Sequence, residues 1–158
     1  MLLFALCTLT VLIYAIINRK NRKNLIPGGI CLLVLMPVGL VPFTQITLKI
    51  EFERDKEDRS KVIEMVRGGA LKPNVTYNPS LIHLPEQYEK LSKGGGDIVV
   101  EGEGDDLQVL FFTFRGALDH FSGFVYTGNG TVPEGEVFGS RLVEVDRLGR
   151  NWFFIRGG

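Results

Sequence analysis

The stretch DIVVEGEGDDLQVLFFTFRG, residues 97–116, contains two runs of strand-forming residues separated by a turn. β-Branched and aromatic residues favour strands, while the intervening Gly104, Asp105 and Asp106 favour a tight connection. The segment VLFFTF (109–114) is apolar on both faces, which is typical of a central strand covered on both sides. The stretch therefore predicts an antiparallel hairpin in the middle of a sheet.

The hairpin is followed by further strand patterns. They are FSGFVYTG (121–128), SRLVEVDRLG (140–149) and NWFFIRG (151–157), and the last two are joined by a hairpin connection. A long loop rich in Gly and Pro, GNGTVPEGEVFG (128–139), separates the first from the second. This order predicts an antiparallel meander.

The residues before the hairpin predict a strand and then a helix. In ITLKIEFE (46–53) apolar and polar residues alternate, which indicates a strand with one buried face. DKEDRSKVIEMVRGG (55–69) changes to helical spacing, with acidic residues first and Arg67 before two glycines. A short helix is expected at 85–92. Residues 44–158 are thus predicted to form a soluble α+β domain with a helix packed on an antiparallel sheet.

The first part of the chain has a different composition. Residues 2–17 and 25–43 carry no charge, and each is close to the length of about 20 residues that spans a bilayer as a helix. The basic segment NRKNRKN (18–24) joins them. Residues 1–43 are therefore predicted to form a two-helix transmembrane hairpin, which makes the chain a two-pass membrane protein.

The basic loop also predicts an orientation. Arg19, Lys20, Arg22 and Lys23 should stay on the cytoplasmic side, which places the C-terminal domain outside the cytoplasm. Basic residues between 49 and 61 lie close to the second span and compete in the same rule. Three alternatives to the hairpin are a cleaved signal peptide, two apolar helices buried in a soluble core, and an interfacial amphipathic helix. A signal peptide would have its basic residues before the apolar run, whereas here they follow it. The polar remainder of the chain is too small to enclose two apolar helices, and neither apolar run has the polar face that an interfacial helix needs.

Composition excludes several kinds of site. Residues 49–158 contain 14 basic and 18 acidic residues, a net charge of −4 that disfavours nucleic-acid binding. Cys7 and Cys31 both lie in the apolar part, and His83 and His120 are the only histidines. A structural zinc site is therefore not expected, and the acidic run EGEGDD (101–106) lacks the spacing of a calcium loop. No catalytic, cofactor-binding or metal-binding residue and no cofactor is predicted.

One constellation resembles a catalytic site. In RGALDHFSG (115–123), Asp119 is next to His120, and Ser122 is close by, so a hydrolase can be imagined. Members of a catalytic triad converge from separate elements, however, and Asp119 in a turn is more simply explained as a cap for backbone N–H groups. Asn74 and Asn129 each begin a glycosylation sequon.

These patterns favour a membrane-anchored extracytoplasmic domain with a binding, scaffolding or accessory role rather than an enzyme. The expected partners are the lipid bilayer and another membrane or envelope protein, with no nucleic acid, and loop 128–139 is the expected contact surface. The alternatives are a membrane-tethered hydrolase that uses His120 and Asp119, and a regulatory domain that faces the cytoplasm.

Overall fold

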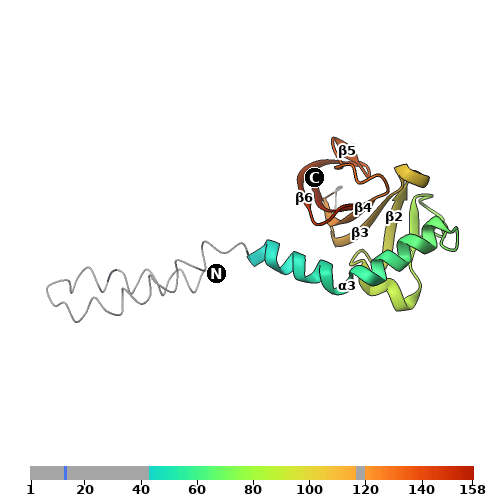
Figure 1. Ribbon diagram of the computed structural model, residues 1–158, viewed down its shortest axis with the longest axis horizontal. Coiled ribbons are helices and arrows are strands. Elements are labelled where there is room, and N and C mark those ends of the chain that lie inside the picture. Colours follow the sequence, from blue (N-terminus) through green and yellow to red (C-terminus); the bar gives the residue numbers. More distant parts are fainter. Residues whose placement is uncertain (1–12, 14–42, 117–119) are drawn as a thin grey trace. The chain divides into compact units, whose positions relative to one another are not determined.

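The computed structural model describes Ile13, residues 43–116 and residues 120–158 (Figure 1). The chain divides into two compact units, Met1–Thr47 and Leu48–Gly158. In chain order the described elements are α3 (Phe43–Arg67), β1 (Leu81–His83), η2 (Glu86–Leu91), β2 (Asp97–Glu101), η3 (Gly104–Asp106), β3 (Gln108–Arg115), β4 (Phe121–Thr127), β5 (Glu136–Val137), β6 (Ser140–Arg147) and β7 (Trp152–Gly157), where η marks a 3-10 helix.

The strand predicted at 46–53 is wrong, because these residues belong to α3. Phe52, Arg59 and Val62 are buried at intervals of seven and three residues, which is the spacing of one helix face. Ile46 and Ile50, half of the apparent two-residue alternation, are 46% and 64% exposed. The alternation therefore mixes residues of the buried helix face with exposed ones, and does not reflect the pleat of a strand.

The predicted end of the helix is confirmed. The N–H of Gly68 donates to the carbonyl of Glu64, and the N–H of Ala70 donates to the carbonyl of Met65. Gly69 has φ +70°, the left-handed conformation that commonly closes a helix. The chain therefore turns away from α3 directly after Arg67.

Within the described residues, seven strands form one antiparallel sheet with the order β1-β2-β3-β4-β7-β6-β5. The strands predicted from the patterns after residue 97 coincide with β2, β3, β4, β6 and β7. The predicted meander is wrong at its end, because β7 lies between β4 and β6: Phe154 is opposite both Phe124 and Asp146. β1 lies in a segment for which no strand was predicted.

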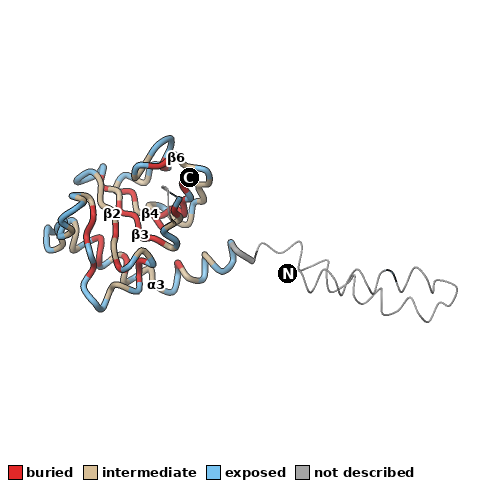
Figure 2. The backbone as a smooth tube through the Cα atoms, turned by 180° about the vertical axis from the view of Figure 1, so that it is seen from behind, coloured by how far each residue is buried: buried red, intermediate tan, exposed pale blue. Residues whose placement is uncertain are grey.

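The sheet curls (Figure 1), and many residues of its strands are buried (Figure 2). Its buried side chains form two separate clusters. On its outer face, residues of α3 such as Phe52 pack with Phe111 and Phe124. On its inner face a second cluster runs from β3 through β4 and β7 to β6. β3 contributes Val109 and Phe111 to the outer cluster and Leu110 and Phe112 to the inner one. The prediction of a central strand covered on both sides is confirmed for residues 109–112 and wrong for Phe114, which is 58% exposed.

The membrane predictions need correction. In the part of the chain that the structure describes, no helix is both long and apolar enough to cross a membrane. α3 has 25 residues but is rich in charged side chains. The spans predicted at 2–17 and 25–43 lie, apart from Ile13 and Phe43, outside the described residues. The predicted fold class, a transmembrane hairpin followed by a helix-on-sheet domain, is therefore wrong: the structure describes the helix α3 and a curled seven-stranded sheet. The predicted two-pass location, with the C-terminal domain outside the cytoplasm, is likewise contradicted, because no described helix could span a membrane.

Candidate functional site

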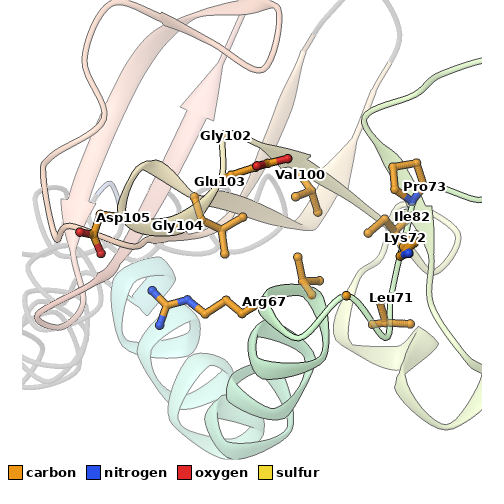
Figure 3. Close-up of a pocket in the computed structure, with 13 residues that line it drawn as sticks. Arg67, Leu71, Lys72, Pro73, Ile82, Val100, Gly102, Glu103, Gly104 and Asp105 are labelled. Carbon is orange, nitrogen blue, oxygen red and sulfur yellow. The ribbon is translucent and has the colours of Figure 1, made fainter.

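An open cleft of about 760 Å³ lies in the second unit, between the end of α3 and the turn that leads from β2 into η3 (Figure 3). We call it the α3–η3 cleft. Its floor is apolar and consists of Val66, Leu71, Ile82, Val100 and Leu107. Ile82 and Leu107 are almost fully buried, and the other three are partly buried against the same outer core. An apolar side chain of a ligand would lose its contact with water here.

Charged residues of both signs line the mouth of the cleft. Arg67 and Lys72 come from the end of α3 and the segment after it, whereas Glu103 and Asp105 come from the β2–η3 side. Figure 3 shows Arg67 extending from the helix, with Lys72 near the other end of the cleft and Glu103 on the opposite wall. None of the ion pairs in the described residues uses any of these four side chains. Their charges are therefore available to a ligand.

The Arg67 side chain is held in place by an aromatic ring. Its guanidinium carbon lies 5.3 Å from the centroid of the Tyr126 ring, within the range of a cation–π contact. Tyr126 comes from β4 and packs against Trp152. This contact reduces the conformational freedom that Arg67 would lose on binding an anionic group.

The wall opposite the helix depends on Gly102. Gly102 has φ +69°, and a Cβ atom there would lie 2.3 Å from the carbonyl oxygen of Asp106. Only glycine fits this turn without moving η3. Gly102 therefore allows the close fold-back that presents Glu103 and Asp105 at the cleft.

The residues of the imagined hydrolase do not line this cleft. Asp119 lies outside the described residues. His120 is exposed, and its carbonyl accepts a hydrogen bond from the N–H of Gly116. The hydroxyl of Ser122 lies 2.9 Å from that of Thr113, so these two side chains hydrogen-bond to each other.

Residues 102–105 of the acidic run 101–106 form part of the cleft wall. Glu101 ends β2, and Gly104–Asp106 is the short helix η3. Among the described residues, no group of three or more His, Cys, Asp or Glu side chains is placed to hold a metal ion. Loop 128–139, the predicted contact surface, contributes none of the described residues that line the cleft, and it includes the strand β5.

The two predicted sequons have local structural roles. The side-chain amide of Asn74 donates from Nδ2 to the carbonyl of His83 over 2.9 Å, and its Oδ1 accepts from the N–H of His83 over 2.7 Å. Asn74 thereby covers the outer edge of β1. The Oδ1 of Asn129 accepts hydrogen bonds from the N–H and the hydroxyl of Thr131, which closes a turn.

The structure also gathers a charge cluster that the sequence analysis missed. His83 Nδ1 lies 2.9 Å from Asp97 Oδ1, and His83 Nε2 lies 3.4 Å from Glu89 Oε1. Arg115 Nη1 lies 3.1 Å from the other oxygen of Asp97. The hydrogen bond with Asp97 raises the pKa of His83. The register of β1 with β2 brings His83 opposite Asp97, and no sequence spacing indicates this pairing.

Comparison with known proteins adds no further assignment. No family model, no curated protein and no solved structure matches the chain. The α3–η3 cleft is consequently interpreted from its own geometry and chemistry.

Proposed function

We propose that residues 48–158 form a binding domain that recognises a short segment of another protein in the α3–η3 cleft. The observation that supports this most directly is the combination of an apolar floor with unpaired charges of both signs on facing walls. A polypeptide segment can offer a matching apolar side chain between an acidic and a basic residue. The volume of about 760 Å³ lies within the range typical of ligand sites.

The charges suggest how such a segment would lie. An acidic residue of the partner would contact Arg67 and Lys72, and a basic residue would contact Glu103 and Asp105. Charge complementarity of this kind contributes mainly to specificity and to the rate of association, while burial of the apolar residue contributes affinity. The net charge of −4 over residues 49–158 supports a protein ligand over a nucleic acid.

A random-nonapeptide display library, selected on the full-length chain, tests the proposal. Enriched peptides should carry an apolar residue between acidic and basic ones. The double variant Arg67→Glu/Lys72→Glu should bind these peptides at least about tenfold more weakly, since it places like charges opposite each other. The same variant should regain affinity for synthetic peptides in which the acidic residue is replaced by Lys.

Arg150→Glu is the control for a charge reversal outside the cleft, because Arg150 is exposed and does not line the cleft, and it is compared with the single variant Arg67→Glu, which changes the net charge equally. The control should bind the enriched peptides like the unmodified protein. The proposal would be contradicted if the enriched peptides shared no sequence pattern, or if the control and the cleft variant lost peptide affinity equally. Isothermal titration with purified peptides provides the affinities.

We propose binding rather than catalysis, and His120→Ala separates this from the rival hydrolase reading. The variant should bind the selected peptides with unchanged affinity, because His120 does not line the α3–η3 cleft. A folded His120→Ala protein that keeps its full function excludes the hydrolase. A folded variant that loses its function while it still binds the selected peptides would instead assign a role to His120, which lines a different pocket of the domain.

A further inference from the structure

A second pocket, of about 490 Å³, lies on the inner face of the curled sheet, away from the face that α3 covers. We call it the inner pocket. Its apolar wall includes Leu110, Phe112 and Phe121, which are buried in the inner core. Phe138, from the connection between β5 and β6, lines the same pocket. The curl of the sheet thus brings a residue next to β5 to a pocket built on β3 and β4, although two strands lie between β4 and β5 in the sheet order.

Phe138 has an unusual backbone conformation. It has φ +53° and is followed by Gly139 with φ +75°, and these two residues connect the paired residues Val137 and Ser140. Positive φ at both central residues is the geometry of a type I′ turn, in which Asn-Gly is strongly preferred and a bulky aromatic residue is strained. The Phe138 side chain packs against the inner core. Strain of this kind persists where the residue has a role that a better turn former would not fulfil.

Arg115 provides a positioned cation at the same pocket. Its Nη1 donates to the carbonyl of Gly94 over 3.3 Å and to Asp97 Oδ2 over 3.1 Å. Its guanidinium carbon lies 5.2 Å from the centroid of the Phe112 ring. In the described part of the chain these contacts occupy Nη1, while Nε and Nη2 are not used in any hydrogen bond. Arg115 is thus held by its ion pair with Asp97, and its Nε–H and Nη2–H groups point to a ligand anion as a second acceptor.

The position of Glu101 indicates which way a ligand would point. Glu101 also lines the pocket, but it is paired with Gln108 at the start of β3, whereas Arg115 is at the end of β3. A ligand with an anionic group would place that group at Arg115 and its apolar body along Leu110 and Phe112. A second anionic group at the other end would meet the Glu101 carboxylate and be disfavoured.

We propose that the inner pocket binds a small monoanion with an aromatic or branched apolar body, that Arg115 holds its anionic group, and that Phe138 covers the bound molecule. This site is separate from the α3–η3 cleft and does not depend on the function proposed for it. The strained turn is explained by the position of the Phe138 ring over the pocket.

Two fluorescent probes test the proposal on the full-length chain. 8-Anilinonaphthalene-1-sulfonate is an aromatic monoanion, and N-phenyl-1-naphthylamine has the same body without the charge. The unmodified protein should bind the anion at least about tenfold more tightly than the neutral probe, because only the anion pairs with Arg115. Arg115→Gln should remove this preference, whereas the control Arg150→Gln, which changes the net charge equally, should keep it.

Phe138→Asn tests the role of the ring. Asn-Gly is the preferred sequence for this turn, so the melting temperature of the ligand-free variant should stay the same or rise. Both probes should nevertheless bind at least about fivefold more weakly than to the unmodified protein, because the covering ring is lost. Unchanged probe affinity in this variant would show that Phe138 does not cover a ligand.

Equal binding of the two probes by the unmodified protein, or the same preference in Arg115→Gln, would overturn the proposal. Phe138→Asn could lose stability as well as affinity. In that case the ratio of the two probe affinities in Arg115→Gln decides whether the inner pocket binds the anion through Arg115. This ratio is measured on one folded variant and therefore does not depend on its stability. Both probes are also titrated against Arg67→Glu/Lys72→Glu, in which the cations of the α3–η3 cleft are replaced, and the preference for the anion that remains in this variant belongs to the inner pocket. A failure of the inner pocket is thereby distinguished from a failure of the α3–η3 cleft.

Discussion

Arg59 places a guanidinium group inside the outer core. Its residue exposure is 2%, and its guanidinium carbon lies 4.5 Å from the centroid of the Phe124 ring. Nη1 donates to the carbonyl of Phe52, Nη2 lies 4.0 Å from Asp55, and Nε is buried without a hydrogen-bond partner. Burial lowers the pKa of Arg59. The side chain thus fills space in the core, but its buried charge is poorly compensated, which is unfavourable for stability.

Two substitutions at Arg59 separate packing from charge. Arg59→Met keeps most of the volume and removes the charge, so the free energy of unfolding should change by less than about 1 kcal/mol or increase. Arg59→Ala also leaves a cavity and should lower it by about 2–4 kcal/mol. Urea denaturation of both variants measures the difference. Equal destabilisation by Met and Ala would mean that the charge itself stabilises the core.

His83 should make stability depend on pH. Its pKa is raised above 6.5, first because of the hydrogen bond with Asp97, so the folded state binds a proton more tightly than the unfolded chain. The resulting stabilisation is fully present below pH 6.5 and is lost as the pH rises through the folded-state pKa. His83→Gln should therefore destabilise the protein more at about pH 5.5 than at about pH 8.5. Chemical denaturation at both values checks this, and an equal effect at the two would contradict it.

At the scale of elements, the edge of β1 depends on one side chain. The amide of Asn74 makes two hydrogen bonds with the backbone of His83, where a further strand would otherwise pair. Exposed N–H and C=O groups at a sheet edge favour association with other chains. Asn74 therefore closes the outer edge of the three-residue strand β1 without adding another strand.

Asn74→Ala should remove this cover. We expect a loss of about 1 kcal/mol in the free energy of unfolding, because two hydrogen bonds at a partly solvated site are lost. Hydrogen exchange at the His83 amide should become faster than in the unmodified protein. Asn129→Ala is the control, since the side chain of Asn129, among the described residues, bonds to Thr131 of its own turn and not to β1. Unchanged protection of the His83 amide would show that Asn74 does not guard the edge.

Elements were predictable where the pattern is local and unambiguous. The hairpin of β2 and β3 and that of β6 and β7 follow from strand-forming runs joined by short polar connections. The first half of α3 was not predictable in this way, because exposed Ile46 and Ile50 complete an apparent strand pattern with buried Phe52. β1 was missed because three residues between Pro79 and Pro85 are too few to show a period.

At the scale of the whole molecule, the arrangement of strands and both pockets lay beyond the sequence pattern. β4 pairs directly with β7, although β5 and β6 come between them in the sequence. No repeat or spacing in the sequence indicates this pairing. The α3–η3 cleft combines Arg67, Ile82 and Glu103, which meet only after α3 packs on the sheet. The apolar runs before residue 43 led to the membrane predictions, which the described helices do not support.

The place of β7 between β4 and β6 also affects how the domain can assemble during synthesis. The ribosome completes β4 well before Trp152, so one edge of an apolar strand stays without a neighbour while the chain through Asn151 is made. Nascent chains with unpaired strand edges aggregate readily. Translation speed across residues 128–151 and the supply of chaperones that hold unfolded chains should therefore strongly influence the yield of native protein.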